Sequence, residues 1–336
     1  MADQQQLDPL EAARLALESA LFRDNPNPWA VGIATGWVPV DGKPVGAQPP
    51  RKILIFVDPA TPQCAWDAIR QQAEGLHQPA VLLRTGRFVG LANGGEGVGY
   101  SAPSQYNVPE VSVGTLALVT TPRGRFVLTS NHVLAHNGRV PQATPVVSPG
   151  LLDDSGGGAV IGNYSDCVPL QAPVWQLPAS PLVAALRGTP ANSVDCAVAA
   201  VAPGATINTT PIATVLNQVP YWTTVTKNGY ATGTQTGIAS VMACGTFIDF
   251  TFGTYWFQGM IGVFSPRGSN PPFAAPGDSG SVACTMAGEG AGLVTARAYV
   301  VDAAGGFVGY IILMCPLAAV QTALGAKLGQ PVQFSR

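Results

Sequence analysis

Charge is scarce in this sequence of 336 residues. Asp, Glu, Lys and Arg make up 11% of the chain, and 17 Lys and Arg against 19 Asp and Glu leave a net charge of −2. Soluble domains usually carry about 25% charged residues. Because no basic stretch is present, neither nucleic acid nor an anionic membrane is an expected partner. The hydrophobic content of 47% also excludes an extended disordered chain.

Long apolar runs are missing as well. The longest covers residues 307–320, is 14 residues long and contains Pro316, whereas a membrane-spanning helix needs about 20 residues. The first residues, Met1-Ala-Asp-Gln-Gln-Gln, have neither the positive charges nor the apolar stretch of a secretory signal. The sequence therefore predicts a cytoplasmic protein without a transmembrane segment.

Cysteines are few and scattered. None of the six belongs to a Cys-x-x-Cys pair, so a zinc site built from cysteines is not expected. They are interpreted as small buried hydrophobic side chains of a protein in a reducing compartment. They are Cys64, Cys167, Cys196, Cys244, Cys284 and Cys315.

Glycine and proline are plentiful, with 39 and 30 residues. Such a composition suits many short elements joined by tight turns, as in a β-rich protein. From residue 110 onward, short apolar runs separated by turn residues predict an antiparallel sandwich or a pair of barrels. The predicted strands are residues 111–120, 125–130, 142–148, 158–164, 194–201, 222–226, 236–243, 246–252, 256–264, 280–286, 291–301 and 306–314.

The N-terminal part follows another pattern. Apolar residues at helical spacing predict a helix over residues 10–22, and a second helix is predicted over residues 65–76. Together with strands at 30–38, 52–57 and 80–85, they form a predicted small α+β module. The glycine-rich residues 94–99 are interpreted as a linker, and a C-terminal helix follows Pro316. The predicted domains are therefore residues 1–95, 96–205 and 206–336.

Three short segments carry the residue types of a hydrolytic site. Val127-Leu-Thr-Ser-Asn-His132 ends a predicted strand with a histidine, and Asn192-Ser-Val-Asp195 begins one with an aspartate. Pro276-Gly-Asp-Ser279-Gly-Ser places a serine on a tight turn, where glycines let backbone N–H groups face a bound carbonyl. The order His, Asp, Ser along the chain is that of chymotrypsin-type peptidases.

With these motifs the chain resembles the chymotrypsin/trypsin-like serine peptidases. The segments at residues 149–157 and 227–237, and the N-terminal unit at residues 31–57, look like those of the plant narrow-leaf trypsin-like proteins and their bacterial relatives. The similarity covers most of residues 28–330. It implies a mainly β fold with two antiparallel six-stranded barrels and an active site in the cleft between them. The first barrel would carry His132 and Asp195, and the second would carry Ser279.

The resemblance also implies the role of each residue. His132 would take the proton of Ser279 during attack and return it to the leaving group. Asp195 would fix the imidazole tautomer, and the N–H groups of Gly277 and Ser279 would form the oxyanion hole. The predicted function is a serine endopeptidase that cleaves a protein or peptide substrate through an acyl-enzyme. No metal or organic cofactor is needed.

A substrate pocket follows from the same resemblance. Phe273, six residues before the serine, would lie at its base, followed by Ala274. The opposite wall would come from residues 294–298, including Ala296 and Arg297. Such a pocket is predicted to be shallow and to prefer small or medium apolar residues. If Arg297 points inward, it would select an acidic residue instead.

Other interpretations remain open for some polar residues. His132 and His136 have the spacing of a zinc pair, but Val133 stands where a zinc metalloprotease has Glu. An exposed His136 is therefore predicted. Three residues, Asp153, Asp154 and Asp166, are rivals of Asp195, and the first two could bind calcium or lie in a solvated turn.

The chain departs from the secreted members in two ways. Val133 and Ala275 occupy positions where those proteins commonly have cysteines, so the usual disulfides are not expected. No activation site is recognisable that would free an N-terminal amine to pair with Asp278, and the sequence does not identify another partner. An inactive peptide-binding scaffold and a hydrolase of non-peptide esters or amides are the alternative functions. A homo-oligomer is also left open.

Overall fold

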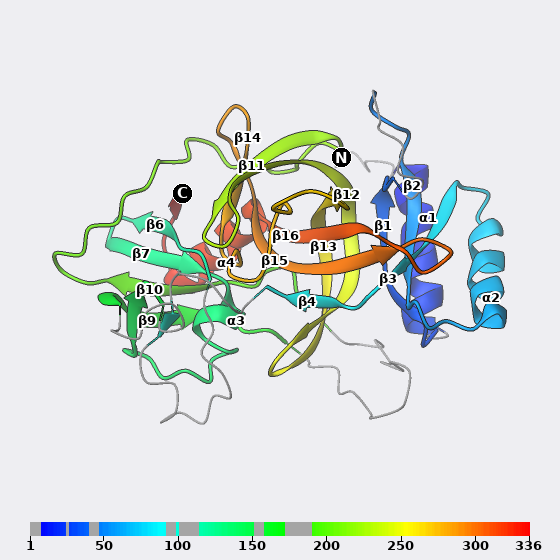
Figure 1. The fold of residues 1–336 in the computed structure, drawn as a ribbon. Helices are drawn as coiled ribbons and strands as arrows, with labels where there is room; N and C mark the ends of the chain where they lie inside the picture. Colours follow the sequence, from blue (N-terminus) through cyan, green and yellow to red (C-terminus); the bar gives the residue numbers. More distant parts are fainter. Residues whose placement is uncertain are drawn as a thin grey trace, which may run out of the picture.

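The computed structural model describes residues 8–24, 27–39, 47–91, 99–100, 114–150, 158–171 and 190–336. Strands dominate this part of the chain and belong to two sheets, which confirms the predicted mainly β fold. Figure 1 shows the N-terminal helices at one end of the molecule, the smaller sheet at the other end and the larger sheet between them.

Six antiparallel strands of the C-terminal half pair in a ring. From β11 the pairing passes through β12, β13, β16, β15 and β14, and it returns from β14 to β11. The sequence predicted two strands at 236–243 and 246–252, but β12 is one long strand whose register shifts absorb the bend. The six strands are β11 (Thr223–Gly229), β12 (Gly233–Phe250), β13 (Gly253–Pro266), β14 (Val282–Thr285), β15 (Gly290–Val301) and β16 (Phe307–Pro316).

The smaller sheet has seven strands in the order β17-β6-β7-β10-β9-β8-β5. Its edge strand β17 comes from the C-terminus, because the buried Val332 and Phe334 draw the last residues into the core beside β6. Within the described ranges no pairing joins the two ends of this series, so closure of the predicted first barrel stays a prediction. Its strands are β5 (Gly99–Tyr100), β6 (Ala117–Thr121), β7 (Gly124–Thr129), β8 (Pro145–Ser148), β9 (Ala159–Cys167), β10 (Ala197–Val201) and β17 (Gln333–Ser335).

The N-terminal elements form where the sequence predicts them, but their sheet is not separate. Strand β1 pairs with β12 and strand β3 pairs with β15, so the larger sheet continues through residue 85. Phe247 and Trp256 of that sheet complete the apolar cluster under the N-terminal helices. The boundary at residue 95 therefore stays a prediction. These elements are α1 (Pro9–Ser19), the π-helix η1 (Ala20–Asp24), β1 (Ala30–Gly36), β2 (Lys52–Val57), α2 (Gln63–Glu74) and β3 (Ala80–Thr85).

Two further elements bear on the site. The short strand β4 (Phe88–Gly90) follows β3 and lies between β12, to which it is parallel, and β15, to which it is antiparallel. The predicted C-terminal helix is confirmed as α4 (Leu317–Leu328), which ends at Gly329 with a left-handed φ of 65°. The glycine-rich residues 94–98, interpreted as a linker, lie outside the described residues.

Cysteine burial is confirmed with one exception. All six cysteines are free, five of them are buried and Cys64 is exposed, because it lies on the outer face of the N-terminal helix α2. Burial raises the pKa of the Cys196 and Cys244 thiols, which makes them inert apolar side chains. Among the helices that the structure describes, none is long and apolar enough to cross a membrane.

Candidate active site

The smaller sheet brings a histidine and an aspartate together at the ends of two neighbouring strands. His132 lies in the single-turn helix α3 (Asn131–Leu134), which begins directly after β7, and Asp195 lies just before β10. Strands β7 and β10 are antiparallel neighbours with Thr129 opposite Ala197. The end of one strand and the start of the other therefore meet, and both side chains are buried.

The larger sheet supplies the serine. Ser279 lies in the turn before β14, and its Oγ is 3.0 Å from His132 Nε2. On the other side of the imidazole, Nδ1 is hydrogen bonded to Asp195 Oδ2, and the His132 amide donates to Asp195 Oδ1 at 3.1 Å. The three residues singled out in the sequence thus form one connected series across the two sheets. With Nδ1–H donating to the carboxylate, Nε2 is left as the acceptor for the serine proton.

The rival aspartates do not reach this series. Asp166 lies on β9 and forms an ion pair with Lys327 at 3.2 Å. Asp153 and Asp154 lie outside the described residues, so calcium binding by this pair stays an alternative. Within the described ranges, no group of three or more His, Cys, Asp and Glu side chains is arranged to hold a metal ion.

The serine turn depends on its glycines. Gly277 and Gly280 have φ values of 101° and 89°, which side chains with a Cβ rarely adopt. A Cβ on Gly280 would lie 2.2 Å from Thr129 Oγ1 and 2.4 Å from the Thr115 carbonyl oxygen, so the turn also packs too closely for any larger residue. The turn is tied to the segment just before β6, because Thr115 N–H donates to the Ser279 carbonyl at 2.7 Å.

One N–H group of this turn already binds a carbonyl. Gly277 N–H donates to the Leu91 carbonyl oxygen at 2.8 Å. The sequence named Gly277 and Ser279 as oxyanion donors, and the first of these N–H groups therefore points to a place where a carbonyl oxygen can lie. Preorganised backbone donors of this kind stabilise an oxyanion without reorganising during the reaction.

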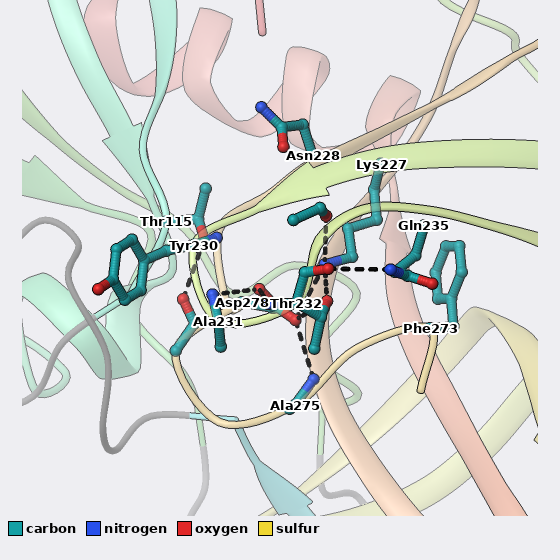
Figure 2. Close-up of polar contacts among 12 residues, drawn as sticks. Thr115, Lys227, Asn228, Tyr230, Ala231, Thr232, Gln235, Phe273, Ala275 and Asp278 are labelled. Carbon is teal, nitrogen blue, oxygen red and sulfur yellow. Dashed lines mark hydrogen bonds and ion pairs between the residues drawn. The ribbon is translucent and has the colours of Figure 1, made fainter. Parts of the chain in front are cut away.

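Asp278, whose partner the sequence left unidentified, is paired with a buried lysine. Lys227 Nζ lies 2.9 Å from Asp278 Oδ2, and both side chains are fully buried. Lys227 also donates to Thr232 Oγ1 and, at 3.2 Å, to the Gly233 carbonyl, so all three of its N–H groups have acceptors. Figure 2 shows the ammonium group inside the β11–β12 hairpin, beside the Asp278 carboxylate.

The carboxylate of Asp278 is equally well supplied with donors. Oδ1 accepts from the N–H groups of Ala231 at 2.9 Å and Thr232 at 3.3 Å. Oδ2 accepts from the Thr232 hydroxyl at 2.7 Å and from Ala275 N–H at 2.9 Å (Figure 2). A buried ion pair with complete hydrogen bonding is stable, although it gains little over apolar packing. This one fixes the conformation of the residue directly before Ser279.

Electrostatics explains why lysine and aspartate need each other here. Burial lowers the pKa of Lys227, and the neighbouring Asp278 carboxylate opposes this shift. Gly229 leaves the room for the pair, because a Cβ there would lie 2.2 Å from Asp278 Oδ1. Sequence reasoning missed Lys227, since a lysine in an alternating strand normally faces solvent. Only the spatial neighbourhood of Asp278 identifies it.

The residues predicted for the substrate pocket divide between two places. Phe273 and Ala274 are buried in the apolar cluster inside the strand ring, together with Val263 and Ile312. Ala296 belongs to the larger core cluster on the opposite face of β15.

Arg297 is half-buried, and its guanidinium carbon lies 4.7 Å from the centre of the Tyr310 ring. The structure therefore brings Phe273 and Ala274 together and leaves Ala296 apart from them. The pocket itself stays a prediction.

His136 is buried, so the predicted exposed position is wrong. The reason is local: after α3 the chain takes a left-handed φ of 44° at His136, which turns the side chain inward. Its ring lies 5.8 Å from the ring of Phe252. Burial, followed by the positive charges of His132 and Arg139, lowers the pKa of His136 to about 4.

This pKa makes the stability of the protein depend on pH. An unfolded histidine titrates near pH 6.5, so between about pH 6.5 and 4 the unfolded chain binds a proton that the folded chain does not. The contribution of the neutral His136 to the free energy of unfolding is thus expected to be present in full above pH 6.5. It should fall by about 3 kcal/mol as the pH drops to 4. Urea denaturation at several pH values measures it.

A matched pair of variants isolates the contribution of His136. His136→Gln should flatten the pH dependence between pH 6.5 and 4, whereas the exposed His77→Gln should leave it unchanged. An equal slope in both variants would contradict the buried, neutral His136.

Comparison with known proteins yields structural matches only. No protein-family profile matches the chain, and no curated protein sequence matches it. A glutamic acid-specific serine protease, described as using a histidine triad in substrate binding, is similar in structure at 15% identity and a TM-score of 0.43. The match covers 73% of this chain and 98% of that one.

Two further matches are of the same kind. Protease A of Thermobifida fusca is 14% identical with a TM-score of 0.40, covering 71% of this chain and 96% of its own. Nocardiopsis protease is 12% identical with a TM-score of 0.40, covering 72% and 98%. The relationship to the plant narrow-leaf proteins is not supported by these comparisons. What chemistry the site performs therefore depends on its own geometry.

Proposed function

We propose that the protein is a serine endopeptidase that cleaves peptide bonds through an acyl-enzyme on Ser279. The observation that carries this proposal is the hydrogen-bonded series from Asp195 through His132 to Ser279 Oγ, closed off from solvent and placed beside the Gly277 N–H. A serine hydroxyl is a weak nucleophile near neutral pH, and an oriented imidazole is the group that activates it.

Each step of the reaction uses a group in this arrangement. Ser279 Oγ attacks the carbonyl carbon while its proton passes to His132 Nε2, and Asp195 stabilises the imidazolium that forms. The negative oxygen accepts from the N–H groups of Gly277 and Ser279. His132 then gives the proton to the departing amine. Water, activated by the same imidazole, hydrolyses the acyl-enzyme and restores Ser279.

The ion pair of Lys227 and Asp278 keeps the oxyanion donors in place. Asp278 stands between Gly277 and Ser279, and its carboxylate is held from the β11–β12 hairpin. A new N-terminal amine is not needed for this carboxylate, because an internal side chain supplies the positive charge. Lys227 is thus a positioning residue, which acts on the oxyanion hole through Asp278.

A peptide suits the site better than a small ester. Strand β15 runs past Ser279, whose Oγ contacts the Thr295 carbonyl. The edge of β15 near Arg297 pairs with another extended segment, β4. An edge that accepts main-chain pairing recognises an extended peptide, and side-chain pockets then add specificity. The same edge would also serve an inactive peptide-binding scaffold, so turnover must be tested directly.

The function is tested with a library of extended peptides incubated with the wild-type protein and with Ser279→Ala. Cleavage by the wild type alone is the expected result. Peptides that bind both proteins but are cleaved by neither would favour the scaffold. Hydrolysis of p-nitrophenyl esters without any peptide cleavage would favour a non-peptide hydrolase.

The proposed pocket predicts the order of preference among substrates. With Phe273 and Ala274 as lining, peptides with Ala, Val or Leu before the scissile bond should exceed those with Arg or Glu by about 100-fold in kcat/KM, because a buried charge would lack a partner. Phe is the sixth residue compared, and it tests whether the pocket is limited to small and medium side chains. Steady-state kinetics on six matched peptides measures this. Preference for Arg would contradict the apolar pocket, and preference for Glu would assign the pocket to Arg297.

A further inference from the structure

The chain's own N-terminal region runs along β15 as far as the catalytic serine. Residues 84 and 85 pair with Val301 and Val300, and Gly86 N–H donates to the Tyr299 carbonyl at 2.9 Å. Strand β4 continues the pairing. In β4, Val89 pairs with Arg297 and Gly90 pairs with Ala296. Figure 1 shows β4 leading from β3 toward the region of α3.

Leu91, the next residue, has its peptide groups at the reacting centre. Its N–H donates to the Thr295 carbonyl at 3.0 Å, and the same carbonyl lies 3.3 Å from Ser279 Oγ. Its own carbonyl oxygen accepts from Gly277 N–H at 2.8 Å. The Leu91 carbonyl therefore lies where the oxyanion of a peptide substrate would form.

The Leu91 side chain occupies an apolar site. It is fully buried, and it belongs to the cluster that contains Phe273, Ala274 and Ile312. Two of these residues are the ones that the proposed function assigns to the primary specificity pocket. The pocket is thus filled from within the same chain by a leucine.

The residues before Leu91 fit the cleft closely. A Cβ on Gly90 would lie 2.7 Å from Phe250 Cδ1 and 3.3 Å from His132 Cδ2, so a larger residue would have to displace the Phe250 ring beside the catalytic imidazole. Phe88 is fully buried, with its ring 5.6 Å from that of Phe56. Arg87 is held by an ion pair with Asp249 at 2.8 Å.

We propose that residues 88–91 occupy the acyl side of the substrate cleft in the way a substrate does, with Leu91 before the scissile bond, so that the chain competes in cis with any other peptide. The assignment of Leu91 to that position rests on the proposed function. Occupancy of the cleft is separate, because it can be measured by binding alone.

Two consequences follow for external substrates. A peptide must displace residues 88–91, and a segment tethered to its own site is present at an effective concentration on the order of millimolar. The favoured peptide should also repeat the features of the occupant: leucine in the pocket, glycine next to it and an aromatic residue two positions further back. The site would thus accept an external peptide only if its sequence fits the cleft and residues 88–91 have left it.

The test uses binding to a protein that cannot turn over. In a Ser279→Ala background, a fluorescent Phe-Val-Gly-Leu amide is titrated against the chain with and without Gly90→Val, and anisotropy gives Kd. Valine at 90 meets Phe250 and His132 and expels the segment, while the peptide keeps its own glycine. Since apparent affinity scales with the unoccupied fraction, Kd should fall at least about tenfold.

Controls keep the result interpretable. Gly75→Ala, at the end of α2 where the nearest atom is 3.5 Å from the new Cβ, should leave Kd unchanged. Leu91→Asp expels the segment by charge instead of size, and it replaces Gly90→Val if thermal melting shows that the latter is unfolded. An unchanged Kd in a folded Gly90→Val or Leu91→Asp chain would overturn the proposal.

A second measurement separates this proposal from the function on which it rests. With Ser279 present, a fluorophosphonate probe should label Gly90→Val at least about tenfold faster than the wild type. Equal labelling rates would be consistent with the serine hydrolase function but would contradict occupancy of the cleft by residues 88–91. If neither chain is labelled but Gly90→Val binds the peptide more tightly, the proposed serine hydrolase function is contradicted, whereas occupancy of the cleft by residues 88–91 is supported. In the wild-type chain, a cut immediately after Leu91 supports the register, whereas a cut between any two of residues 86–91 contradicts it.

Discussion

Replacing Ser279 by alanine is expected to lower kcat/KM for peptide cleavage by about 10⁵- to 10⁶-fold, because the members of such a series act as a unit. The hydroxyl makes hydrogen bonds with His132 Nε2 and the Thr295 carbonyl, and removing it leaves no atom to attack the substrate. Alanine at this buried position creates little space. The melting temperature should therefore remain close to that of the wild type while activity disappears.

Ser281 offers a matched control within the same motif. It is buried two residues further along, and in the described structure its Oγ has no hydrogen-bond partner. Ser281→Ala should keep peptide cleavage within about threefold of the wild type, as expected for a neutral change away from the reacting atoms. Equal losses at Ser279 and Ser281 would mean that the turn, and not a nucleophile, had been damaged.

The second large effect is expected at Lys227. Lys227→Met keeps the length of the side chain but leaves the Asp278 carboxylate buried without a positive charge. Breaking a buried ion pair in this way costs about 3–5 kcal/mol of stability. Because Asp278 lies between the oxyanion donors, kcat/KM should also fall by about 10²- to 10³-fold, as on loss of such a donor. Kinetics and urea denaturation measure the two effects.

Two comparisons assign this loss to positioning of the loop. Lys327→Met removes a half-exposed ion pair with Asp166 and should change stability by less than about 1 kcal/mol. The double variant Lys227→Met/Asp278→Asn removes both buried charges and should recover at least half of the lost stability, with activity still low. Normal kcat in a stable Lys227→Met chain would contradict the positioning role.

The sequence predicted the chemistry of the site better than its surroundings. His132, Asp195 and Ser279 stand in short motifs whose meaning depends on local residue order, and the structure brings all three together. The strand positions were also predicted well, because alternating apolar residues and turn signals are local features.

What the sequence could not predict depends on contacts between distant residues. Lys227 and Asp278 are 51 positions apart, from 227 to 278, and only pairing within the larger sheet brings them together. The continuation of that sheet into β1 and β3 likewise depends on long-range pairing. His136 was predicted to be exposed because Val133 argues against a zinc pair with His132, whereas a left-handed backbone turns its side chain inward.

The central claim is that the contacts of His132 activate Ser279, and a fluorophosphonate probe tests it most directly. Adducts are located by peptide mapping and mass spectrometry on the wild type, His132→Ala and Ser281→Ala. The predicted result is one adduct, on Ser279, that persists in Ser281→Ala and is lost in His132→Ala. An adduct on another residue, or equal labelling of Ser279 without His132, would contradict the account.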